Sequence, residues 1–133
     1  MNKDMLMIDG LQYVNWNRGL FEQAQRAGLH AIHVTIAYWE NSRETLENIG
    51  HWNRHFLDHG DLIIPVHQAA DILEAKRLGK VGIIFGFQNC SPMEDDVKMV
   101  QILHQLGVRI MQLSYNNQSL LATGCYEEQL FEE

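Results

Sequence analysis

A unit made of a helical segment, a glycine and a short β-rich run is repeated four times along this chain of 133 residues. In the last unit, the helical segment 95–106 leads through Gly107 into the apolar run 108–113. Glycine is typical of a helix C-terminus because it tolerates positive φ. The four glycines of the repeat are Gly28, Gly60, Gly79 and Gly107. Since a further apolar run precedes the first helix, the predicted order of elements is β-α-β-α-β-α-β-α-β.

Strands that are joined by single helices are expected to be parallel, with right-handed crossovers. The pattern therefore predicts an α/β fold, and one form that fits it is the first five units of a (β/α)8 TIM-like barrel. Because a complete barrel takes about 250 residues, the barrel is expected to be incomplete. The alternative is a five-stranded doubly wound flavodoxin-like sheet, which needs a last helix after its fifth strand. We expect a single partial barrel domain over residues 1–133, with strands near 5–8, 31–36, 62–66, 81–87 and 108–114.

Two helix starts carry the pattern of a capping box, in which a small polar residue precedes an acidic residue by three positions. Asn41 and Glu44 have this spacing, and so do Ser91 and Glu94, where Pro92 also occupies the first helical position. The sequence therefore predicts that helices begin directly after Asn41 and Ser91.

The charge and hydropathy of the chain exclude several classes of partner. Ten Lys and Arg residues against 17 Asp and Glu residues give a net charge of −7, and the basic residues are scattered rather than clustered. A nucleic-acid partner is therefore not expected. The apolar runs are far shorter than the roughly 20 residues that cross a bilayer, and the N-terminus lacks the pattern of a secretory signal. We expect no membrane association, a cytoplasmic location and two reduced cysteines, Cys90 and Cys125.

In parallel α/β folds, the functional residues gather at the carboxyl ends of the strands. Those ends are rich in amides and aromatic residues here, for example 12–17, 38–39, 88–89 and 115–118, and poor in carboxylates and histidines. Such side chains can hydrogen-bond and stack on a small polar ligand, whereas imidazole, thiolate and carboxylate groups bind divalent metals. They can equally serve only to cap helices and connect loops, and both interpretations remain open at this point.

Histidines are the other candidates for metal or catalytic chemistry. His51, His55 and His59 fall at i, i+4 and i+8 on one helical face, which we interpret as a solvated outer face rather than a zinc site. His33 alternates with apolar residues on the second predicted strand and is expected to be a hydrogen-bonded core residue.

Three segments of the chain resemble the membrane (renal-type) dipeptidase family. They are Ile8-Asp9-Gly10 at the end of the first strand, Gly86-Phe87-Gln88-Asn89-Cys90-Ser91-Pro92 after the fourth, and the long segment 105–118, which reads QLGVRIMQLSYNNQ. The resemblance extends from about Met5 to Glu127, and segment 105–118 is its most specific part.

This resemblance implies a (β/α)8 barrel of the amidohydrolase kind that hydrolyses dipeptides with two zinc ions. It also implies a His-x-Asp pair of ligands at positions 11 and 13, a bridging Glu at position 88 and a substrate-contacting His at position 115. This chain has Leu11, Tyr13, Gln88 and Tyr115 at those positions. Zinc is therefore the cofactor that the family implies, while the sequence predicts no metal ligands of its own at these positions.

From these observations we expect a dipeptidase-like hydrolase that cleaves dipeptides or similar small amides and is inactive as this isolated chain. The expected substrate pocket is formed by Tyr13, Gln88, Asn89, Tyr115 and Asn116, and the sequence assigns no catalytic residue. The alternative is a non-hydrolytic barrel protein that binds a small polar ligand or acts as a structural partner. Because five strands of a barrel leave open edges, we also expect the chain to associate or to need the missing C-terminal half.

Overall fold

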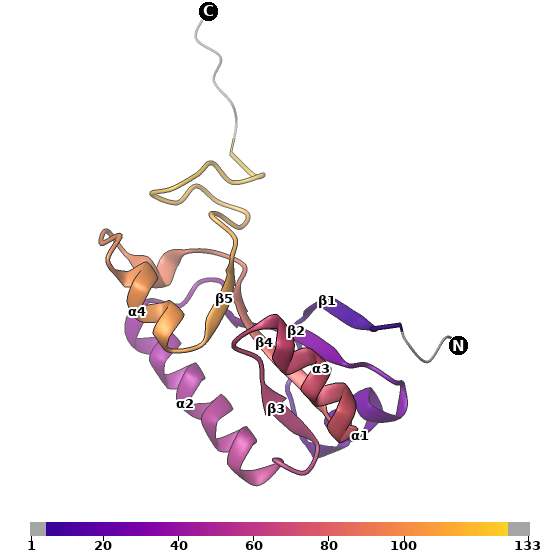
Figure 1. Ribbon diagram of the computed structural model, residues 1–133. Helices are drawn as coiled ribbons and strands as arrows, with labels where there is room; N and C mark the ends of the chain where they lie inside the picture. Colours follow the sequence, from indigo (N-terminus) through magenta and orange to yellow (C-terminus); the bar gives the residue numbers. More distant parts are fainter. Residues whose placement is uncertain (1–4, 128–133) are drawn as a thin grey trace, which may run out of the picture.

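The computed structural model describes residues 5–127 and contains one parallel sheet with helices between consecutive strands (Figure 1). The strands are β1 (Ile8–Gln12), β2 (Ala31–Ala37), β3 (Ile63–Pro65), β4 (Val81–Phe87) and β5 (Val108–Met111). The helices are α1 (Arg18–Arg26), α2 (Ser42–Asp58), α3 (Ala69–Leu78) and α4 (Met99–Gln105), with a single 3-10 turn, η1 (Ser91–Met93), before α4. The predicted alternation of strands and helices is confirmed.

The order of the strands in the sheet is not strictly sequential, as it would be if each strand paired with the next one along the chain. β1 pairs with β2, and β2 pairs with β4, all in parallel. β3 pairs with the first half of β4, through Ile63 opposite Val81, and β5 pairs with the second half, through Phe85 opposite Val108. Both short strands therefore share one edge of β4, each along half of its length.

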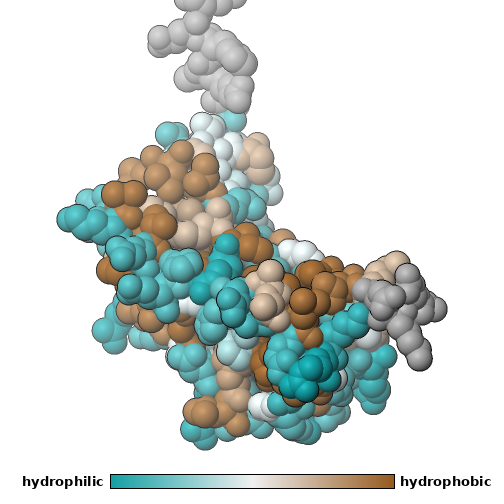
Figure 2. All heavy atoms as spheres, viewed as in Figure 1, coloured by the Kyte–Doolittle hydropathy of each residue, from teal (hydrophilic) through white to brown (hydrophobic). Residues whose placement is uncertain are grey.

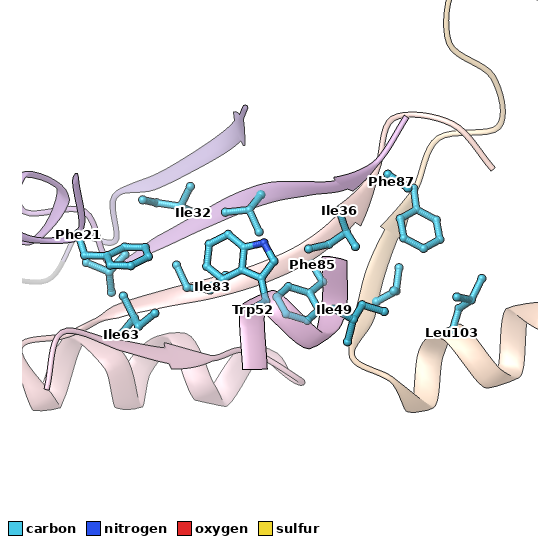
Figure 3. Packing of buried hydrophobic residues seen from close by; sticks show 14 of the residues in the cluster. Phe21, Ile32, Ile36, Ile49, Trp52, Ile63, Ile83, Phe85, Phe87 and Leu103 are labelled. Atoms are coloured by element: carbon cyan, nitrogen blue, oxygen red, sulfur yellow. The ribbon is translucent and has the colours of Figure 1, made fainter. Parts of the chain in front are cut away.

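The hydrophobic core lies on one side of this sheet. Phe21 of α1, Trp52 of α2 and Leu103 of α4 belong to one buried cluster with the strand residues Ile32 and Phe85. Figure 3 shows these side chains packed beside the strands. The buried residue of α3, Ala75, is not part of this cluster. A flavodoxin-like doubly wound sheet needs a last helix after its fifth strand. Within residues 5–127 no helix follows β5, which argues against this alternative.

Three of the boundaries predicted from sequence are wrong. The first strand begins at Ile8 rather than near residue 5, because pairing with β2 starts where Ile8 meets Ala31. The last strand ends at Met111, before the predicted limit at 114. The helix predicted after Ser91 is only η1, since Glu94 has a φ of 51°, and α4 begins later, at Met99.

Other local predictions are confirmed. The capping box of α2 forms, with the Asn41 side chain accepting from the Glu44 backbone N–H and the Glu44 side chain accepting from the Asn41 backbone N–H. Gly28, Gly79 and Gly107 have positive φ at or just after helix ends, as the repeat predicts, whereas Gly60, the fourth glycine of the repeat, does not. No helix among residues 5–127 is long and apolar enough to cross a membrane.

Candidate functional site

Aromatic side chains from three loops meet at the carboxyl ends of the strands. The hydroxyl groups of Tyr13, after β1, and Tyr38, after β2, lie 2.9 Å apart and share a hydrogen bond. Tyr115, after β5, packs edge-on against Tyr38 and Trp39, with ring centroids 6.1 and 5.3 Å away. The structure therefore brings the predicted residues Tyr13 and Tyr115 into one cluster, connected through Tyr38.

Gln88 lies at the same end of the sheet, directly after β4. Its Nε2 donates a hydrogen bond of 2.8 Å to the hydroxyl oxygen of Thr35 on β2. The pairing of Thr35 with Gly86 in the register of β2 and β4 explains this contact, because Gln88 lies two residues beyond Gly86 on the same face. The amide of Gln88 is therefore held against the neighbouring strand.

His33 lies two residues before Thr35 in β2, so both side chains are on the same face of the sheet. Its Nδ1 lies 2.7 Å from the Gly10 carbonyl oxygen, and since a carbonyl only accepts, Nδ1 carries the proton. Nε2 is buried without a hydrogen-bond partner in the described part of the chain. The ring covers Gly86, where a Cβ atom would lie 1.8 Å from Nε2. The expected buried, hydrogen-bonded His33 is confirmed at Nδ1, and the close approach explains the glycine.

The remaining two predicted residues, Asn89 and Asn116, follow β4 and β5. Asn89 is buried, its Oδ1 has no partner among residues 5–127, and the residue lines a second hollow with Trp39 and the loop 117–121. Asn116 belongs to the segment after β5, where its carbonyl oxygen accepts from the Tyr126 backbone N–H. The backbone of Asn116 is therefore held within its own loop, and Tyr13 and Asn89 line different hollows.

Sequence reasoning missed the residues that connect the site. Tyr38 is in contact with both predicted tyrosines, and Thr35 holds Gln88, yet neither was selected. The available signal was their position at the end of β2, where Tyr38 directly follows the strand. The alternation of the strand also placed Thr35 on the same face as His33.

The outer histidines were partly misread. His51 is exposed, but His55 and His59 are partly buried against Phe21, with ring centroids 5.6 and 5.5 Å from it. Burial lowers the pKa of His55, and the neighbouring His59 lowers it further. The predicted solvated face is therefore wrong for two of the three residues, because α2 turns this part of its surface toward α1.

The donor groups present do not fit a two-zinc centre. Leu11 has no ligating atom, Tyr13 shares its hydroxyl with Tyr38, and the neutral amide of Gln88 is bound to Thr35. Within residues 5–127, no cluster of three or more His, Cys, Asp or Glu side chains could hold a metal ion. A neutral amide cannot bridge two dications as a carboxylate does. This part of the barrel wall therefore provides hydrogen-bonding side chains rather than metal ligands.

Comparison with protein families decides the relationship. Residues 12–133 match the model of the membrane dipeptidases, peptidase family M19. The chain belongs to this family. M19 is a zinc-dependent family of dipeptidase-like hydrolases, so the expected kinship and the barrel fold are both confirmed. A comparison with curated proteins found no significant match.

Solved structures support the same kinship. A crystal structure described as an amidohydrolase from Pseudomonas aeruginosa is 46% identical over 95% of this chain, with a TM-score of 0.92. The probable dipeptidase PvdM from Pseudomonas aeruginosa is 16% identical over 91% of the chain (TM-score 0.80), and a metallopeptidase described as dipeptidase AC is 14% identical over 84% (TM-score 0.71). This chain spans only 39%, 37% and 43% of those three chains.

Proposed function

We propose that this chain forms one substrate-facing wall of an M19 barrel that acts on dipeptides or similar small amides. The observation that carries the proposal is the cluster of Tyr13, Tyr38 and Tyr115 at the carboxyl ends of the strands, at the same end of the sheet as Gln88. Hydroxyl and amide groups on a ring-lined surface suit a small ligand that has peptide N–H and C=O groups. In the proposal, Asn89 and Asn116 flank this surface and contribute further amide groups.

We further propose that the isolated chain does not hydrolyse its ligand. Zinc, where it is bound, would activate the water for hydrolysis. The three positions at which the family resemblance implies ligands hold Leu11, Tyr13 and Gln88 in this chain. Zinc, if it takes part, would have to be held by residues outside the described part of this chain. Its role here stays a family expectation.

A second candidate function is non-hydrolytic binding of a small polar ligand. The observation that favours it is the Gln88 amide, which is already engaged with Thr35. A side chain fixed in this way can present its carbonyl oxygen to a ligand, but it cannot act as a base or a bridging ligand.

We also propose that the remaining strands of a barrel cover the concave side of the sheet. β1 forms one outer edge, and within residues 5–127 it pairs only with β2. Ile8 and Ile110 belong to the face of the sheet opposite the core cluster, and they are 47% and 41% exposed. Figure 2 shows hydrophobic side chains along β1 and around α4 on the visible face. A second half of the barrel, in the same chain or a partner, would bury this surface.

A cytoplasmic location is part of the same proposal. It is supported by two free cysteines, the buried Cys90 and the exposed Cys125, which are typical of a reducing compartment.

Metal content and dipeptide hydrolysis, measured together on the purified chain, test the proposed function. We expect no stoichiometric zinc after chelation and zinc addition, no turnover, and saturable binding of a dipeptide by calorimetry that Tyr115→Ala weakens. As a matched gain-of-ligand control, the triple variant Leu11→His, Tyr13→Asp, Gln88→Glu should retain zinc where the parent does not. Stoichiometric zinc with chelator-sensitive turnover in the parent chain would contradict the proposal, and absence of any dipeptide binding would remove the substrate assignment.

A further inference from the structure

A cavity of about 340 Å³ lies behind the tyrosine cluster, toward the outer helix layer. One wall is the segment 13–16 after β1, the second is the end of β2, and the third is the inner face of α2 around Trp52. Tyr13 and Tyr38 separate it from the concave face of the sheet, because they belong to both surfaces. The cavity is therefore adjacent to the proposed substrate wall but has its own lining.

Glu40 supplies the charge of this cavity. Its Oε2 accepts hydrogen bonds from the backbone N–H groups of Tyr38 and Trp39, at 2.8 and 3.0 Å, and its Oε1 lies 3.5 Å from Nδ2 of Asn48. These bonds fix the carboxylate in place before any ligand arrives. Among the residues that the structure describes, no Lys, Arg or second carboxylate lines the cavity.

The imidazole of His55 on α2 does not cancel this negative charge. His55 lines the cavity, and burial together with the neighbouring His59 lowers its pKa below the ordinary value for histidine. His55 is therefore mostly neutral at pH 7. It leaves the carboxylate of Glu40 without a cationic partner at that position.

The remaining lining includes four large aromatic side chains, Tyr13, Trp16, Tyr38 and Trp52. The rings of Tyr13 and Tyr38 stand at 79° to each other with centroids 5.1 Å apart, and those of Trp16 and Trp52 are inclined at 58° at 5.9 Å. Rings set at such angles form corners rather than flat stacks. The face of an indole or phenol ring attracts a cation, and several rings around one carboxylate are a recurring arrangement for ammonium ions.

We propose that this cavity binds a small organic cation, either a primary amine or a quaternary ammonium ion. Glu40 would provide the counter-charge, while Trp16, Tyr13 and Tyr38 would provide the ring surfaces. The volume accommodates a small ligand of this class. Among the described residues, Oε1 of Glu40 has only the long 3.5 Å contact with Nδ2 of Asn48, so it can accept a further hydrogen bond from a ligand. The inference goes beyond the proposed function and does not depend on it, because neither zinc nor hydrolysis takes part.

The binding test uses n-butylammonium and tetramethylammonium chloride as probes, with n-butanol and tert-butanol as neutral counterparts of similar size. Binding to the full 133-residue chain is followed by calorimetry and by tryptophan fluorescence, because Trp16 and Trp52 line the cavity. Sodium chloride keeps the ionic strength constant. We expect saturable binding of at least one cation and no saturable binding of the alcohols. Equal binding of cation and alcohol, or no binding of either cation, would overturn the proposal.

Two pairs of variants locate the site. Glu40→Gln should weaken cation binding at least tenfold, whereas Glu47→Gln, on the exposed side of α2 beside Arg43, should leave it unchanged.

Tyr13→Leu should weaken binding about threefold or more, while Tyr13→Phe, which keeps the ring, should not. Because Tyr13 is 62% exposed, this second pair remains informative if Glu40→Gln fails to fold, which circular dichroism would reveal. Unchanged affinity in Tyr13→Leu together with unchanged affinity in a folded Glu40→Gln would overturn the assignment. Loss of dipeptide binding alone would leave it standing.

Discussion

The two faces of the sheet differ sharply in composition and in burial. The face toward the helices carries large side chains such as Ile32, Ile83 and Phe85, all of them at most 5% exposed. The opposite face carries Gly82 and Gly86 in β4, together with Ile8 and Ile110, which remain largely exposed. One face is therefore completed by the chain itself. The other has the small residues and the uncovered apolar groups of a surface that another layer packs against.

The largest expected difference between the faces is in the free energy of unfolding. Phe85→Ala should lower it by about 3–5 kcal/mol, because the ring is buried against Trp52 and Phe56 and its removal leaves a cavity. Ile110→Ala, on the open face, should lower it by less than about 1 kcal/mol. Urea unfolding followed by circular dichroism measures both values. Similar losses in the two variants would show that the open face is packed as tightly as the helix face.

Gly86→Ala tests a place where the open face is closely packed. The new methyl group would occupy the position of the His33 ring, so we expect a loss of about 1–3 kcal/mol in the free energy of unfolding. His33→Ala removes the obstacle, and the double variant should therefore lose less than the sum of the single variants. Thermodynamic double-mutant analysis measures this coupling. Strict additivity would mean that the His33 ring does not cover Gly86 in solution.

The two faces should also differ in self-association, which involves smaller free energies than the substitutions above. We expect the chain to associate at micromolar concentration through the open face and the unpaired edge of β1, as measured by light scattering coupled to size-exclusion chromatography. Ile8→Lys combined with Ile110→Lys should reduce association, while Leu57→Lys, an exposed substitution on α2, should not. A monomeric parent chain with one cooperative unfolding transition would contradict the proposal that this face needs a cover.

The smallest expected effect is a pH dependence on the helix side. The folded-state pKa of His55 is lowered from its ordinary value near 6.5, so the unfolded state binds more protons as the pH falls through that range. Stability should therefore decrease on acidification below about pH 6.5. Chemical unfolding at a series of pH values measures this slope, which His55→Gln should flatten. An unchanged slope in the variant would assign the effect to another group.

Much of the fold could be predicted from sequence because it depends on local chemistry. The helix-glycine-strand repeat gave the element order, the Asn41–Glu44 pair gave the start of α2, and β4 was delimited from Val81 to Phe87. The failures have local causes that sequence patterns do not show. The positive φ of Glu94 prevents a helix after Ser91, and the first strand begins at Ile8 because its bounds are set by pairing with β2.

The candidate site was predictable only in part. Strand ends could be found from periodicity, which placed Tyr13, Gln88 and Tyr115 at one end of the sheet. That Tyr38 joins the two tyrosines, that Thr35 holds Gln88, and that Asn116 supports its own loop all depend on distances between segments far apart in sequence. The cavity around Glu40 was not predicted for the same reason, since its three walls come from three elements.

The sequence by itself determined the α/β class, the family motifs and the replacement of the family's ligand positions by Leu11, Tyr13 and Gln88, because these depend on residue identity and short-range periodicity. Only the tertiary structure decided that all helices in the core cluster cover one face, that β3 and β5 share the edge of β4, and that His55 is partly buried. These features arise from how separate elements pack, and packing selects among arrangements that the local sequence leaves equally open.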